Sequence, residues 1–138
     1  MNSYLYEEIA VGTAESFEVV VTDGMLELFK KLSGDTNPLH TDRDYAEKKG
    51  FSDRVVYGML TASFYSRLIG VYLPGEHCLF QELEAKFSKP VYPGDKLTVS
   101  GTVSEKNDLF KRIVIKAEIR NSDGIKVSSA KIKAGVTA

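Results

Sequence analysis

The chain has 138 residues, of which 43% are hydrophobic and 27% charged, and its formal net charge is −1. This length fits one domain, spanning residues 1–138, with a real hydrophobic core. The composition is that of an ordinary soluble globular protein. A net charge so close to zero gives no basic face for nucleic acid and no polybasic patch for a membrane surface.

Cysteine and histidine are both scarce. Cys78 is the only cysteine, which excludes an intrachain disulfide and fits a reducing compartment. No charged segment followed by an apolar one precedes Val11, so we expect no signal peptide and a cytoplasmic protein. With one cysteine and two histidines, we also expect no dedicated zinc site.

The first elements in chain order are a strand and two helices. Residues 14–22 alternate in polarity and are rich in β-branched side chains, which predicts a strand. A helix is predicted over residues 22–34, because Thr22 or Asp23 can cap its start and a glycine stops it. A short helix is predicted over residues 41–50, again closed by a glycine.

Residues 55–73 form the most apolar segment. They are apolar nearly all round, which predicts a helix wrapped by other structure. Hydroxyl groups throughout the segment and Arg67 near its end favour a buried helix over a membrane span. Pro74 and Gly75 end it.

The second half of the chain alternates between apolar and polar positions, which is typical of half-buried strands. One long apolar helix with four or five long antiparallel strands predicts an α+β protein of the hot-dog fold, in which the sheet curls around the helix. An exposed edge strand of such a sheet can pair with a second copy, so we expect a homodimer. The predicted strands cover residues 78–92, 95–106, 110–121 and 125–136.

The segment SGDTNPLHTD, residues 33–42, crowds an acid, an amide and an imidazole around a proline. Helix capping explains Asn37 and Pro38, since asparagine suits the N-cap and proline the first helical position. Capping leaves His40, one of two histidines, without a role.

Residues 29–46 resemble the signature of the MaoC-like (R)-specific enoyl-CoA hydratases, which share a G-D-x-N-P-[LIV]-H core with a small residue six positions after the histidine. Residues 55–70 are similar to the central-helix segment of that family, and residues 87–97 to its later strand–turn–strand. The resemblance implies a hot-dog enzyme that acts on an acyl thioester of coenzyme A or of acyl-carrier protein and needs no other cofactor. The matching residues of the core are Gly34, Asp35, Asn37, Pro38, Leu39, His40 and Ala46.

Adding water to an enoyl thioester requires a base for the water and an acid for the α-carbon. The charge that develops on the thioester oxygen must also be stabilised. Our preferred assignment makes His40 the base and Asp35 the acid, and the reverse assignment stays open. A carboxyl that is protonated near neutrality needs an apolar surround, so we expect Asp35 to be shielded.

Gly58 opens the apolar helix, where backbone N–H groups lack partners, so its N–H is the candidate donor to the thioester oxygen. The family resemblance places a polar contact to the catalytic aspartate at Ser66 and a water or substrate contact at Asn37. Each residue also has a structural explanation: Gly58 as a close-packing glycine, Ser66 as an ordinary helix hydroxyl, and Asn37 as a helix cap.

Two further residues shape the expected site. Many family members have histidine immediately before the helix glycine, where this chain has Tyr57; tyrosine is a poor base near neutrality, which leaves any secondary role of that position in doubt. Ile69 continues the stripe of Gly58 at helical spacing, so we expect it to limit the acyl tail to short chains of about four to six carbons. The alternative is that Ile69 belongs to the core.

Three other functions are known alternatives for a hot-dog domain that handles acyl thioesters. A 3-hydroxyacyl-carrier-protein dehydratase runs the same chemistry backwards and differs only in its carrier. A hot-dog thioesterase typically has an acid on the central helix, and residues 55–73 contain no Asp or Glu. A non-catalytic acyl-thioester binding module has no need for both Asp35 and His40.

Overall fold

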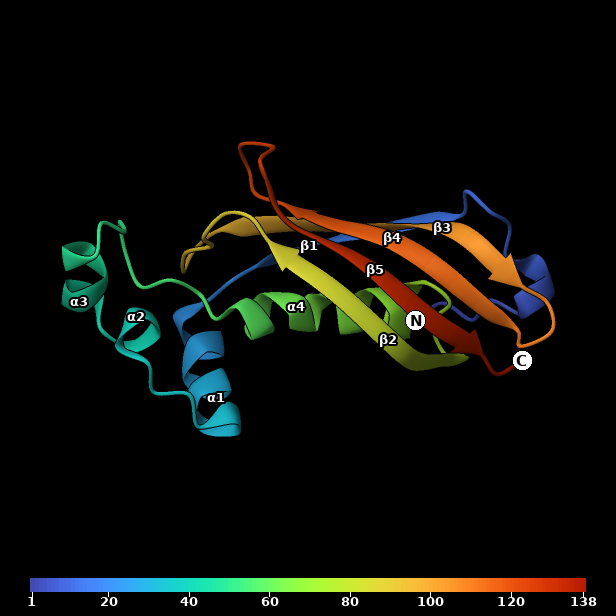
Figure 1. Ribbon diagram of the computed structural model, residues 1–138, viewed down its shortest axis with the longest axis horizontal. Helices are drawn as coiled ribbons and strands as arrows, with labels where there is room; N and C mark the ends of the chain where they lie inside the picture. The colour runs from blue at the N-terminus through green and yellow to red at the C-terminus, as the bar shows by residue number, and fades with distance from the viewer.

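A computed structural model describes all 138 residues of the chain. Figure 1 shows a single antiparallel sheet with one long helix lying against it and three short helices to one side. The strand order is β1-β3-β4-β5-β2, so β1 and β2 form the two edges. The strands are β1 (Ala14–Val20), β2 (Cys78–Phe87), β3 (Lys96–Asn107), β4 (Arg112–Arg120) and β5 (Lys126–Val136).

The alternating pattern of the sequence decides which face of each strand is buried. In β3, for example, Leu97, Val99 and Val103 are buried, while the residues between them are largely exposed or half-buried. The side chains of a strand point to opposite faces in turn, so this pattern produces one packed face and one wet face. The predicted strands of the second half are therefore present, three of them with ends within two residues of the prediction. The strand predicted over residues 78–92 was wrong at its end, because it stops at Phe87 and is followed by a loop that contains Pro90.

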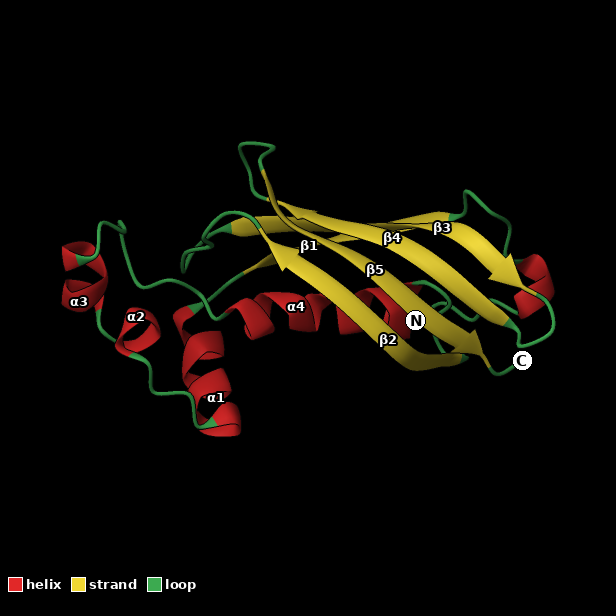
Figure 2. Cartoon of the chain, viewed as in Figure 1, coloured by secondary structure: helices red, strands yellow, loops and turns green.

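Helix α4 (Gly58–Arg67) lies along the packed face of the sheet, as Figure 2 shows, and continues into the π-helical turn η2 (Leu68–Tyr72). The helix was predicted to begin at Val55, but residues 55–57 lie outside it and α4 begins at Gly58. The N–H of Val55 donates to the carbonyl of Leu39, and that of Val56 to the carbonyl of Val91. These backbone bonds to distant segments replace the first helical turn.

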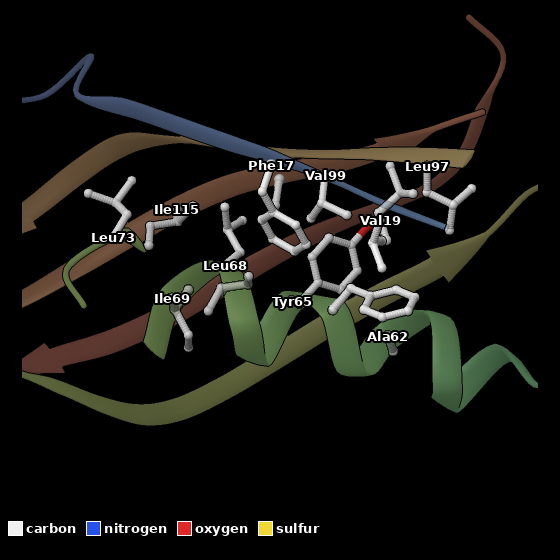
Figure 3. Close-up of a cluster of buried hydrophobic side chains, with 14 of the residues drawn as sticks. Phe17, Val19, Ala62, Tyr65, Leu68, Ile69, Leu73, Leu97, Val99 and Ile115 are labelled. Carbon is white, nitrogen blue, oxygen red and sulfur yellow. The ribbon is translucent and has the colours of Figure 1, made fainter. Parts of the chain in front are cut away.

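The core forms where η2 meets the sheet. Figure 3 shows Leu68 and Leu73 gathered with Phe17 and Ile115 among the buried side chains. At this level the sheet contributes Gly101, and a Cβ built there would lie 2.8 Å from Leu68 Cδ2 and 2.9 Å from Ile115 Cγ2. The glycine therefore lets the helical segment approach the sheet closely. Burying each large apolar side chain stabilises the fold by about 1.5–3 kcal/mol.

The opposite face of α4 is open in the protomer. Met59 is 64% exposed, and Ser63, Ser66 and Arg67 are exposed as well. The sequence predicted a helix wrapped on all sides, but the sheet covers only one side of it. An apolar side chain such as Met59 therefore faces solvent in the single chain.

The short helices form an arm beside the sheet (Figure 1). Thr22 Oγ1 accepts a hydrogen bond from the N–H of Met25 at 3.2 Å, and Gly34 ends the first helix with φ of 72°. Both features were predicted from the sequence. The chain has no helix with the length and apolar character needed to cross a bilayer. The remaining elements are η1 (Tyr6–Glu8), α1 (Asp23–Ser33), α2 (Pro38–Thr41) and α3 (Arg43–Lys48).

Candidate functional site

The turn between α1 and α2 is built from short-range hydrogen bonds. Ser33 Oγ accepts from the N–H of Asp35 at 3.1 Å, and Asp35 Oδ1 accepts from the N–H of Asn37 at 3.0 Å. Asn37 Oδ1 in turn accepts from the N–H of Leu39 at 2.9 Å, which caps α2. The capping interpretation of Asn37 is thus confirmed, and its contact with substrate stays a prediction. These short-range hydrogen bonds hold the backbone of Asp35 within the turn.

The ring of His40 has a fixed orientation and a fixed tautomer. Its Nδ1 lies 2.6 Å from the carbonyl oxygen of Val55, and a carbonyl can only accept a hydrogen bond. Nδ1 therefore carries the proton, and Nε2 of the neutral ring keeps its lone pair. The adjacent backbone is tied to the same segment, because Val55 N–H donates to Leu39 O at 3.1 Å. Such a ring is prepared to accept a proton at Nε2.

Tyr57 joins the two candidate catalytic residues. Its hydroxyl donates to the backbone carbonyl of Asp35 at 2.6 Å, and its ring packs on the His40 ring with centroids 4.2 Å apart. The Phe29 ring lies on it at 4.8 Å. Tyr57 is 2% exposed, and burial together with the nearby Asp35 charge raises the pKa of its hydroxyl. It is therefore a neutral hydrogen-bond donor rather than a base.

A cavity of about 360 Å³ lies beside His40 and the start of α4. Gly58 lines it, and the Gly58 N–H donates to no other group of the protein. No side chain caps this helix start. A Cβ added at Gly58 would lie 3.5 Å from the Phe87 ring, so the glycine keeps the space between them open. The remaining lining residues are Phe51, Val55, Val56, Thr61, Ser88, Lys89, Pro90, Val91 and Val127.

Three of the predicted site residues, Asp35, Asn37 and Ser66, lie apart from this cavity within the protomer. Asp35 is exposed and does not line it, so the protomer alone does not provide the shielding that we expected. Ser66 is exposed on the open face of α4, eight residues beyond Gly58, which corresponds to a rise of about 12 Å. Ser66 forms no side-chain hydrogen bond to Asp35.

Ile69 is also separate from the cavity. It is 1% exposed and belongs to the main core cluster, together with Leu68. Ile69 lies eleven residues beyond Gly58, a rise of about 16 Å, in the turn η2 that packs against the sheet. The four-residue spacing from Gly58 does not follow one face even within α4, since Ala62 is buried and Ser66 is exposed.

The arrangement suits proton transfer beside a polarised carbonyl. His40 Nε2 can take a proton from water, and the free N–H of Gly58 at the positive end of α4 can bind an oxygen that gains negative charge. No group of three or more His, Cys, Asp or Glu side chains lies together in a way that could hold a metal ion.

Sequence reasoning missed the role of Tyr57. The signal was present, since an aromatic residue with a hydroxyl stands immediately before the helix glycine. Its role is to hold two neighbours in place, and only the folded arrangement brings Asp35 and His40 within its reach.

The chain is similar to known proteins in sequence. Residues 9–124 match the family described as "MaoC like domain". The chain is 37% identical over 101 residues to an (R)-specific enoyl-CoA hydratase of Rhodospirillum rubrum, which covers 73% of this chain and 70% of the relative. It is 40% identical over 72 residues to a mitochondrial 3-hydroxyacyl-[acyl-carrier-protein] dehydratase of Arabidopsis thaliana, covering 52% of this chain and 42% of that protein.

The solved structures give the same fold. The unliganded R-hydratase of Pseudomonas aeruginosa superposes with a TM-score of 0.90 at 30% identity, over 96% of this chain and 84% of that one. The predicted hot-dog fold is therefore confirmed. With a family match that extends from residue 9 to residue 124, this chain belongs to the MaoC-like domain family.

Proposed function

We propose that this chain catalyses the (R)-specific hydration of a trans-2-enoyl-CoA to the (R)-3-hydroxyacyl-CoA, and the reverse dehydration. It is thus a hydro-lyase. The observation that carries the proposal is the hydrogen bond of 2.6 Å between His40 Nδ1 and the Val55 carbonyl, because it leaves Nε2 as a base next to the cavity that Gly58 lines. The names of relatives with up to 37% identity over most of this chain support the reaction class and its stereochemistry.

The reaction then proceeds by one base, one acid and one hydrogen-bond donor. His40 Nε2 takes a proton from water while the water oxygen bonds to the β-carbon of the enoyl group. The electron pair of the double bond moves toward the thioester oxygen, which the Gly58 N–H stabilises. Asp35 then donates a proton to the α-carbon. In the dehydration direction each proton moves the opposite way.

The proposal includes a homodimer, because the protomer leaves two apolar surfaces exposed and one strand edge unpaired. The open face of α4 exposes Met59, the outer edge of β2 is unpaired, and β2 exposes Leu79 and Phe80. Pairing of two β2 edges would continue the sheet and cover these side chains. A second copy on this side would also supply the shielding of Asp35 that the single chain lacks.

The dimer can be tested through the site itself. If Ser66 of one copy serves Asp35 of the other, mixing the two weakly active variants Asp35→Ala and Ser66→Ala after subunit exchange restores part of the activity, since one site per mixed dimer is intact. Light scattering at micromolar concentration should give twice the mass of one chain. A monomer by light scattering, fully active, would contradict the dimer while leaving the reaction intact.

The preferred substrate carries a short to medium acyl chain. A cavity of about 360 Å³ has to hold the thioester together with part of its acyl chain and carrier arm, which leaves little room for a long tail. The alternative is a 3-hydroxyacyl-carrier-protein dehydratase, which would use the same residues and differ in the carrier. The Arabidopsis relative, with its shorter match, is the observation that favours this second candidate.

The deciding experiment follows the loss of the enoyl absorbance of crotonyl-CoA and the chirality of the product. We expect turnover by the wild-type chain and an (R)-3-hydroxy product. Absence of turnover on enoyl thioesters of both coenzyme A and carrier protein, or an (S) product, would refute the proposal.

A further inference from the structure

We propose that Lys89, supported by Lys86 and Lys126, binds the phosphate groups of the carrier arm that brings the acyl thioester to the site. The inference rests on the proposed function and specifies how the carrier is recognised. The ligand chemistry is a phosphate ester joined to the thioester through a long flexible arm, as in coenzyme A or a phosphopantetheinyl group.

The first observation is the charge inside the cavity. Apart from His40, Lys89 is the only ionisable side chain among its lining residues, and no Asp or Glu lines it. The other lining residues are apolar or carry hydroxyl groups. An enoyl thioester is neutral along its acyl part, so the only anionic part of the substrate is the phosphate-bearing end of its carrier. The single cation of the cavity therefore matches the single anionic end of the substrate.

The second observation is that the backbone around Lys89 is held in place. The N–H of Ser88 donates to Val127 O at 2.9 Å, and Ser88 Oγ donates to Lys126 O at 3.0 Å. Pro90 follows directly and restricts the backbone further. Lys89 is exposed although it lines the cavity, so it lies at the rim rather than inside. This is where the arm of a bound thioester would leave the protein.

The third observation is a row of cations at this end of the sheet. Lys86 and Lys126 line a second hollow, of about 570 Å³, on the opposite face of the sheet, because they alternate along β2 and β5 with Phe87 and Val127 of the catalytic cavity. They therefore support Lys89 through the positive potential at this end of the sheet and not through direct contact with the same phosphate. Residues 86–90 and 125–128 together contain three lysines and no Asp or Glu. This end of the sheet is therefore locally positive, although the net charge of the whole chain is −1.

Most of this positive charge is not neutralised by the protein. Neither Lys86 nor Lys89 has a carboxylate oxygen within 4.0 Å. Lys126 lies 3.6 Å from Glu118, which also pairs with Arg120 at 3.0 Å. The two free ammonium groups are available to an anionic ligand.

The experiment removes the charge and keeps a polar side chain of nearly the same length. The variants are Lys89→Gln and the double variant Lys86→Gln/Lys126→Gln. The matched control is Lys96→Gln, because Lys96 pairs with Glu18 on β1 at the far edge of the sheet. Each protein is assayed with three crotonyl thioesters, those of coenzyme A, of 4′-phosphopantetheine and of pantetheine, of which the last has no phosphate.

We expect the KM of Lys89→Gln for crotonyl-CoA to rise about fivefold with kcat unchanged, as fits a partly exposed ion pair. The double variant should show a smaller rise, and the control none. The KM for the pantetheine thioester should not change in any variant. The phosphopantetheine thioester identifies the source: an equal loss points to the phosphate of the arm, and no loss points to the phosphates next to the adenosine.

An unchanged KM for both phosphate-bearing thioesters would overturn the proposal. An equal loss on the pantetheine thioester would also overturn it, because Lys89 would then act on the reacting end, as it would if it bound an acidic acyl tail. Titration calorimetry with free coenzyme A measures binding of the carrier by the same proteins without any reaction, so it tests the phosphate site independently of the hydratase activity. Weaker binding to Lys89→Gln in a protein without hydratase activity would refute the proposed function and uphold the phosphate site.

Discussion

The sheet with α4 and the turn at residues 33–42 are held together by different means. In the sheet, strands as far apart in sequence as β1 and β3 bury a common core that includes Phe17, Val99 and Ile132. In the turn nearly every residue is exposed, and most of its hydrogen bonds join groups two to four residues apart. The contacts of Tyr57 and two hydrogen bonds to Val55, from His40 Nδ1 and to Leu39 O, tie it to the rest of the molecule. Substitutions in the sheet should therefore lower stability, and substitutions in the turn should lower turnover.

The largest effect is expected for the two candidate catalytic residues of the turn, Asp35 and His40. His40→Gln and Asp35→Asn should each lower kcat by about 10²–10⁴-fold, the usual contribution of a general acid or base. The double variant should be little worse than either single one, because both residues act on one reaction. Melting temperatures should stay close to wild type, since Asp35 is exposed and His40 only half-buried. Steady-state kinetics with crotonyl-CoA measure this; near wild-type turnover in both single variants would show that the site is elsewhere.

Ile69→Ala tests the packed core between the sheet and the helical segment. Because Ile69 is 1% exposed in the core, we expect a loss of about 2–5 kcal/mol in the free energy of unfolding. The milder Ile69→Val should lose about 0.5–1.5 kcal/mol. The ratio of kcat/KM between four-, six- and eight-carbon enoyl-CoA substrates should not change. A shift toward longer chains would instead place Ile69 at the acyl tail, as the sequence suggested.

Gly58→Ala should separate stability from activity at one position. The new methyl group would make an ordinary contact with the Phe87 ring, and alanine favours a helix over glycine, so the melting temperature should not fall. The methyl group would occupy the space of the thioester, so kcat/KM should drop about 10–100-fold. The matched control is Gly24→Ala in α1, where the added Cβ would also fit, with nothing closer than Thr22 Oγ1 at 3.7 Å. Equal activity in both variants would remove Gly58 from the site.

Tyr57→Phe tests the link between the turn and the core. The ring contact with His40 remains, but the hydrogen bond to the Asp35 carbonyl is lost, so we expect kcat to fall about fivefold with KM nearly unchanged. Tyr65→Phe is the matched control, since it removes a buried hydroxyl that donates to Ser128 at 2.8 Å, away from the cavity. The control should lose about 1 kcal/mol of stability and keep its kcat. A drop in kcat for both variants would indicate that losing any buried hydroxyl makes the fold less rigid, and would contradict a specific role of Tyr57.

The smallest expected effect concerns Cys78. Burial raises the pKa of its thiol from 9.0 to about 11, so at pH 8 the folded protein should react with a disulfide reagent far more slowly than the unfolded protein in guanidinium. The raised pKa also means that its contribution to stability is complete below pH 9 and is lost as the pH rises toward 11. Cys78→Ala should reduce this decline. Equal thiol reactivity in both states would contradict the burial.

The sequence predicted features that depend on neighbouring residues. The alternation of the strands, the capping by Thr22 and Asn37 and the stop at Gly34 all follow from local preferences, and all are present. The start of α4 and the burial of Ile69 were not predictable in this way. The first depends on backbone bonds to distant segments, and the second on the packing of residues 68–72 against the sheet.

In the candidate site, too, the local features were predictable from the sequence and the long-range contacts were not. The motif identified Asp35, His40 and Gly58, but it could not show that Tyr57 would connect them, because that contact joins segments 22 residues apart in the chain. Nor could it show that Asp35 and Ser66 are both exposed in the single chain. Their exposure is a property of the whole surface, which no local pattern records.

The close approach at Gly101 has a consequence for how this sequence can change over time. Any side chain at that position would overlap Leu68 or Ile115, so an acceptable replacement would require simultaneous shrinkage of a neighbour. The flanking Ser100 and Thr102 point to the wet face and carry no such restriction. Sequences that descend from this one while keeping its fold should vary freely at those two flanking positions, and should keep glycine between them unless Leu68 or Ile115 is replaced by a smaller residue as well.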